Sequence, residues 1–148
     1  MVRRSGDVVV ASSVVGTLYL TGQQPITAAP MVPTFALAEL DPSGQVTASL
    51  QAAGRQLELR ALQRTAGDTV LVTLTVGGTA TLGGAVLEGP DAGFDTFLVE
   101  LGPRLAVLRT QRLAAGPGTA EGSVFPASDG GYLAVARFST AADFGCGL

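Results

Sequence analysis

The chain has no histidine, no lysine and no tryptophan, and a single cysteine, Cys146. The absence of histidine excludes a Ser-His-Asp triad and leaves zinc without its usual ligands. One cysteine cannot form a disulfide within the chain, so cysteine usage does not indicate the redox compartment. A nucleophilic cysteine usually needs a base or cation that favours its thiolate. We therefore interpret Cys146 as a structural or incidental thiol.

Charge is also scarce: 14% of the 148 residues are charged, the net charge is −3, and all nine cationic residues are arginines without a basic run. Nucleic-acid binding needs clustered Lys and Arg, so this class of partner is disfavoured. No apolar stretch is long enough to span a membrane as a helix. The hydrophobic content of 47% argues against disorder. Together with the β-branched residues and frequent glycine, it favours one all-β domain.

The first 22 residues, MVRRSGDVVVASSVVGTLYLTG, have a basic start followed by an apolar run, as a short signal peptide does. Asp7 interrupts this run, and Ser12, Ser13 and Thr17 dilute it. A similar segment opens at Gly67, in the middle of the chain, where no signal peptide could act. We therefore predict a strand here.

An internal repeat organises the sequence. Apolar runs open at Gly6, Gly67 and Gly130, and each passes through small residues and closes on glycine. Residues 36–42, ALAELDP, also match residues 97–103, FLVELGP, at a spacing of 61. A fixed period of this length is typical of propellers and solenoids.

Gly- and Pro-rich segments separate the runs in which we predict strands. Three prolines in residues 23–33 predict a loop, because proline cannot donate a ladder hydrogen bond. Residues 52–56 and 83–93 are also predicted as loops. The predicted strands are 8–15 with a continuation at 17–20, 35–40, 46–51, 57–64, 69–76 with a continuation at 79–82, 95–101, 105–113, 123–127 and 132–139.

Two local signals refine this prediction. Asp41-Pro42-Ser43-Gly44 is typical of a hairpin turn, because proline presets φ and glycine tolerates the left-handed region. Residues 57–64, LELRALQR, contain good helix formers. Their mostly two-residue alternation favours a strand instead.

Three motifs together resemble the SBBP-type β-propeller repeat of bacterial envelope and secreted proteins. Residues 36–44, ALAELDPSG, are similar to the first hairpin of that repeat, and residues 95–101, DTFLVEL, repeat it. Residues 128–135, SDGGYLAV, are similar to its second hairpin. Glu39 and Glu100 stand where that family usually has lysine. The resemblance implies propeller blades, each an antiparallel four-stranded sheet. It does not indicate whether the protein has an activity.

The resemblance divides the single repeat region 1–148 into a partial blade at 1–56, a complete blade at 57–113 and a partial blade at 114–148. A propeller typically needs about four to eight blades to close. The chain is then a piece of a longer propeller, a truncated product, or a protomer completed by its neighbours through head-to-tail contacts. A small β-sandwich built from a duplicated sheet is the alternative.

Few residues suggest chemistry. Asp91 and Asp95 lie four apart, with Glu88 nearby, and oxygen-rich loops can hold calcium. The sequence has no Asp-x-Asp-x-Asp ladder, so we interpret these as solvated turn acids. The paired glycines at 77–78 and 83–84 lack the spacing and the lysine of a phosphate-binding loop.

Glu39 and Glu100 could be considered a general acid/base pair. They occupy equivalent positions in successive units, which would set them well apart in a propeller. We interpret them as structural repetition and assign no catalytic, cofactor or metal residue.

Three functional classes remain open. The first is a non-catalytic extracellular or cell-envelope module that binds a protein or glycan through its loops. The second is a structural fragment without independent activity, and the third is a carbohydrate-active enzyme module. The absence of catalytic clusters favours the first class. Neighbouring blades or self-association are expected partners.

Overall fold

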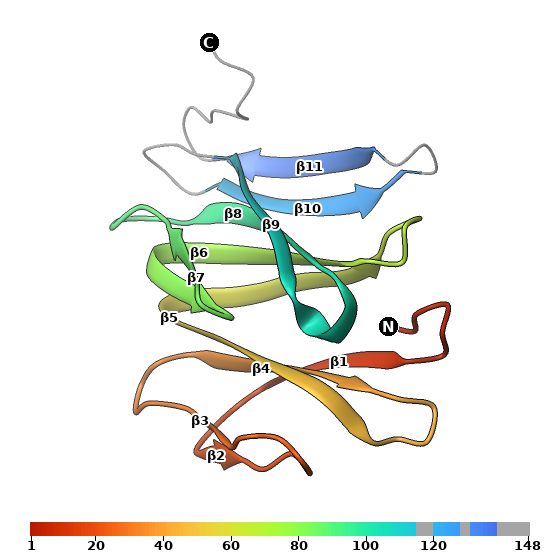
Figure 1. Ribbon diagram of the computed structural model, residues 1–148. Helices are drawn as coiled ribbons and strands as arrows, with labels where there is room; N and C mark the ends of the chain where they lie inside the picture. Colours follow the sequence, from red (N-terminus) through yellow and green to blue (C-terminus); the bar gives the residue numbers. More distant parts are fainter. Residues whose placement is uncertain (115–119, 128–130, 139–148) are drawn as a thin grey trace.

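The computed structural model describes residues 1–114, 120–127 and 131–138, and these form the expected all-β fold (Figure 1). The main sheet is antiparallel and has the strand order β1-β4-β5-β6-β8-β9, and β7 also pairs with β6. Its strands are β1 (Val8–Ser13), β4 (Thr34–Leu40), β5 (Val46–Arg64), β6 (Val70–Leu82), β7 (Ala85–Glu88), β8 (Asp95–Leu101) and β9 (Val107–Ala114).

Two small antiparallel sheets lie on opposite sides of the main sheet. The first pairs β2 (Thr17–Leu18) with β3 (Ile26–Thr27), and the second pairs β10 (Ala120–Pro126) with β11 (Tyr132–Phe138). In Figure 1 the β2–β3 pair lies at the bottom and the β10–β11 pair at the top.

Strand β5 folds the main sheet into two layers. Its N-terminal half pairs with β4, and its C-terminal half pairs with β6. Strands β5 and β6 approach closely at Gly54 of β5, where an added Cβ would lie 2.6 Å from the Cβ of Ala80 in β6. We call β1, β4 and the first half of β5 the first layer, and the second half of β5 with β6, β8 and β9 the second layer.

The core lies between the two layers. Val9 and Leu37 of the first layer join Val72, Leu74 and Val99 of the second in one buried cluster. These side chains are all fully buried. Burial of each such side chain contributes about 1.5–3 kcal/mol, so this interface is the main source of stability.

Each small sheet covers the outer face of one layer. Outside the first layer, Val14, Ile26 and Ala36 form a buried cluster. Outside the second layer, Val124 of β10 packs on Leu71 and Leu98. The described residues therefore form a stack of layers, in which the β2–β3 pair lies on the outer face of the first layer although it falls between β1 and β4 in the chain.

Some of the predicted boundaries are wrong. Residues 52–56 are predicted as a loop but belong to the continuous strand β5, and the expected break after Val76 lies inside β6. The predicted loops 23–33 and 83–93 contain the short strands β3 and β7. In each case pairing with a neighbouring strand prevails over weak local β-propensity. Residues 57–64 are strand, as predicted.

The two long hairpins of the main sheet turn differently. Between β4 and β5, the Asp41 side chain accepts hydrogen bonds from the backbone N–H of Ser43 and Gln45, both at 2.9 Å. The Ser43 hydroxyl, which donates to the same oxygen at 2.6 Å, is the largest cause of the lowered pKa of Asp41. Between β8 and β9 the chain forms a short 3₁₀ turn, Pro103–Leu105. The predicted strand start at Leu105 is therefore wrong.

Candidate binding surface

An apolar groove lies beside the end of β1, between residues 13–16 and 28–35. Backbone hydrogen bonds of 2.8 Å join these segments, from Val14 N–H to the Thr34 carbonyl and from Ala28 N–H to the Gly16 carbonyl. The cavity has a volume of about 530 Å³. No charged residue occurs between Val8 and Ala38, so the groove has an uncharged lining.

Two large apolar side chains of this groove face solvent. Val15 is 98% exposed and Met31 is 100% exposed. Pro30 and Pro33 flank Met31 and fix their own φ angles, and Met31 itself has a φ of 59°. Isolated exposed apolar residues are ordinary, but a concave apolar surface with exposed apolar residues indicates a binding site.

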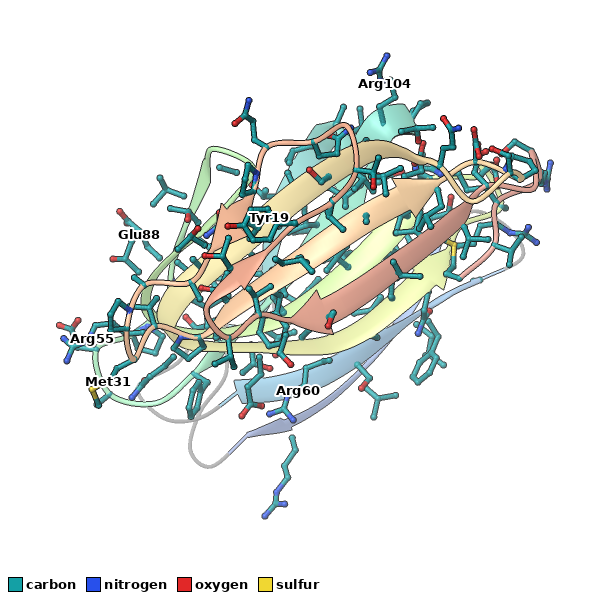
Figure 2. All side chains as sticks on the ribbon, turned by 90° about the horizontal axis from the view of Figure 1, so that it is seen from below. Tyr19, Met31, Arg55, Arg60, Glu88 and Arg104 are labelled. Carbon is teal, nitrogen blue, oxygen red and sulfur yellow. The ribbon has the colours of Figure 1, made fainter. Side chains whose placement is uncertain are left out.

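A second hollow of about 650 Å³ adjoins the groove and shares Pro30, Met31 and Val32 with it. Its other walls include Arg55, Gln56 and Asp91. Figure 2 shows Met31 and Arg55 at the same end of the molecule, with Glu88 nearby and Arg104 on a different side. The combined surface is therefore apolar at one end and has one residue of each charge at the other.

A β-bulge positions the polar side of this surface. Gly54 pairs with Ala80 and Gln56 with Gly77, so Arg55 lies opposite two residues of β6. Gly78, one of these two, has a φ of 66°. A bulge of this kind changes the direction of the neighbouring side chains and is common beside functional sites.

The acidic residues considered from the sequence do not come together. Asp91 is exposed in the hollow, whereas Asp95 is fully buried and forms an ion pair with Arg112. Glu88 is exposed on β7. Across residues 1–114, 120–127 and 131–138, no three His, Cys, Asp or Glu residues could hold a metal ion. Cys146 lies outside the described residues.

Glu39 and Glu100 are both held by other side chains. Glu39 is 5% exposed, and its Oε2 lies 2.9 Å from Nη2 of Arg3. Glu100 accepts a hydrogen bond of 2.6 Å from the Thr69 hydroxyl, and Nε of Arg109 lies 4.0 Å from its Oε2. Because β5 and β6 separate β4 from β8 in the sheet order, the two carboxylates have different surroundings and separate partners.

The Arg3–Glu39 pair links the N-terminal segment to both layers. Arg3 also donates hydrogen bonds to the backbone carbonyls of Asp68 at 2.7 Å and Gly102 at 2.6 Å. The other oxygen of Glu39 accepts a hydrogen bond of 3.3 Å from the backbone N–H of Arg104. This buried cluster satisfies both charges, as burial of an ion pair requires.

Sequence reasoning missed the residues that form the groove and the hollow. Residues 23–33 and 52–56, which supply Met31 and Arg55, are predicted as loops, and the prediction of binding through loops singles out neither segment. One available signal was the placement of Met31 and Val32 between prolines, within a long uncharged stretch. The bulge that places Arg55 depends on pairing across β5 and β6, which no local pattern reveals.

Comparison of the chain with protein-family models, with curated proteins and with solved structures finds no match in any of the three. Within the described part of the chain, no helix is long and apolar enough to cross a membrane.

Proposed function

We propose that this chain is a non-catalytic binding module whose apolar groove binds an uncharged segment of a protein partner. The observation that carries the proposal is the groove itself, an apolar cavity of about 530 Å³ bordered by Val15 and Met31. Binding hot spots are commonly large side chains at the centre of well-packed, water-excluding contacts. Prolines in the wall reduce the entropy lost when a partner binds.

The layered architecture supports a repeat module of the SBBP type as the scaffold. Leu37 belongs to the core between the layers, so its side chain is on the face of β4 that meets the second layer. Glu39 lies two residues further on and therefore shares that face. Glu100 and Leu98 lie on the face of β8 that meets β10, since Leu98 packs with Val124. Each copy of the repeated glutamate thus faces the layer that follows it, as stacked repeats require.

Two substitutions test the groove. A library of displayed random peptides would be selected on the wild-type chain, and binding of the selected peptides compared with the Val15→Asp and Met31→Asp variants. A desolvated carboxylate in an apolar contact is costly, so we expect each variant to weaken binding at least about tenfold, or 1.4 kcal/mol. Val86→Asp is the matched control, because Val86 is 58% exposed and lines neither cavity.

The outcomes separate the functional classes. Loss of binding in both groove variants, with the urea midpoint and the control unchanged, supports the proposal. Peptides that bind the groove variants as well as the wild type would contradict it. Hydrolase or lyase activity that disappears on changing Glu39 or Glu100 would also overturn it, in favour of a carbohydrate-active enzyme.

A further inference from the structure

The edge of β1 differs from the other long edges of the molecule. In the sheet order β1 has one strand neighbour, β4, and a single bridge joins its first residue, Val8, to Val2. Edge strands usually carry charges that prevent pairing with other chains. Strand β9 has exposed Arg109 and Arg112, and β11 has exposed Arg137, whereas β1 contains no charged residue. The part of β1 beyond the N-terminal segment therefore lacks the charges that usually protect an edge.

The backbone groups that β1 offers at this edge follow from its register. Val14 N–H donates to the Thr34 carbonyl, on the β4 side. Val9 N–H donates to the Met1 carbonyl, on the opposite side, and the Met1 ammonium donates to the Val9 carbonyl at 2.9 Å. Because successive residues of an antiparallel strand address opposite edges, Ala11 and Ser13 direct their N–H and C=O groups away from β4.

These two residues form a short self-complementary edge. The Met1 segment already covers Val9, and β1 ends at Ser13. The Ser13 carbonyl accepts one hydrogen bond, of 3.2 Å from the Ser12 hydroxyl, and a carbonyl has two lone pairs. Antiparallel pairing of Ala11 with Ser13 of a second copy uses all the remaining outward groups of both strands. In that register the two copies of Ser12 lie opposite each other.

In the second repeat unit, the place equivalent to this edge is occupied by a strand. Strand β6 opens at the same place in its repeat unit as β1, and β6 has β5 on one side and β8 on the other. Among the described residues, the equivalent side of β1 has only the N-terminal segment beside it, which bridges Val2 with Val8 and leaves the end of β1 from Ala11 to Ser13 uncovered. A second copy fits this side electrostatically, because an uncharged edge meets its own copy without like-charge repulsion.

We propose that two copies of the chain pair through their β1 edges across a two-fold axis at Ser12. This contact is isologous, unlike the head-to-tail contacts expected from the sequence, and it joins the two first layers into one continuous sheet. It does not depend on the binding function proposed for the groove.

A cysteine at the axis gives the sharpest test. Residues opposite each other in a non-hydrogen-bonded antiparallel pair have Cα atoms about 4.5 Å apart, within the range that a disulfide spans. In a Cys146→Ser background, we expect Ser12→Cys to form a disulfide-linked dimer under mild oxidation. The matched control is Gln111→Cys, on the exposed edge strand β9, which we expect to remain largely monomeric on a denaturing gel.

A second variant tests the same contact without a crosslink. Light scattering should give twice the chain mass of 14.9 kDa for the wild type, and Ser12→Lys should shift the chain to monomer by placing two ammonium groups at the axis. Gln111→Lys should leave the dimer intact. A wild-type monomer up to its solubility limit would overturn the proposal. So would a dimer that crosslinks equally through position 111, or open-ended oligomers that Ser12→Lys does not disrupt.

Discussion

The two copies of the repeated hairpin strand, β4 and β8, share two leucines and the glutamate at three of seven aligned positions but have different surroundings. Glu39 in β4 faces the second layer, which contains β6, β8, β9 and half of β5, and is buried with Arg3. Glu100 in β8 faces the two-stranded β10–β11 sheet, and its side chain remains 23% exposed. The motif sets the direction of the glutamate, and the size of the covering layer sets its burial.

This difference changes what each carboxylate contributes to stability. Glu39 is part of a cluster in which every hydrogen bond crosses between segments distant in sequence. Glu100 bonds to Thr69 and lies 4.0 Å from a half-exposed Arg109. Exposed ion pairs contribute little, because water and salt screen them. A repeated residue can therefore be essential for stability in one unit and nearly dispensable in the next.

The largest expected effect is that of Glu39→Ala. The substitution leaves the Arg3 guanidinium buried without its carboxylate, and we expect a loss of about 3–5 kcal/mol in the free energy of unfolding measured with urea. The matched Glu100→Ala variant should lose about 1 kcal/mol or less. Equal losses in the two variants would show that coverage does not distinguish the two copies.

The first residue of each strand provides a smaller contrast. Thr34 opens β4 and donates a hydrogen bond of 3.1 Å to the Val32 carbonyl, whereas Asp95 opens β8, is fully buried and pairs with Arg112. Removing this guanidinium by Arg112→Ala should cost about 2 kcal/mol, because the buried carboxylate loses its counter-charge.

Thr34→Val removes a neutral hydrogen bond, and should cost about 1 kcal/mol or less by the same urea measurement. The contrast would be refuted if Thr34→Val were the more damaging change.

The turns of the two hairpins give the smallest contrast, visible only in acid. Hydrogen bonds from Ser43 and Gln45 lower the pKa of Asp41 below its ordinary value of 3.8, while Gly102 occupies the matching position of the second hairpin. A folded-state pKa below the unfolded one gives stability that is present above pH 3.8 and is lost as pH falls through the folded pKa.

We therefore expect Asp41→Asn to flatten the fall in the urea midpoint on acidification below that pH. An unchanged acid profile in the variant would mean that the turn hydrogen bonds do not favour the ionised carboxylate.

Much of the fold follows from local patterns. Alternating apolar runs predict most strands of the main sheet, and the Asp41–Gly44 turn follows from residue types that preset its backbone angles. The continuity of β5 does not follow from local patterns, because Ala52, Ala53 and Gly54 have low β-propensity. They remain extended because β4 and β6 both pair with this segment.

The binding surface is less predictable than the strands. Asp91 is recognisable from the sequence as a loop acid. Arg55, which lines the same hollow, is placed there by a bulge that depends on the register of β5 with β6. The role of Arg3 is equally hard to predict from the sequence, since its hydrogen-bond partners lie 36 to 99 residues away. Contacts between layers are set by packing over such separations, and the local sequence carries no record of them.

The most direct test of the role of layer coverage is a pair of double-mutant cycles followed by urea unfolding. One cycle combines Arg3→Ala with Glu39→Ala, and the other combines Arg109→Ala with Glu100→Ala. Coverage by the second layer predicts a coupling energy of about 2 kcal/mol or more in the first cycle and a value near zero in the second. Couplings of equal size would contradict the account.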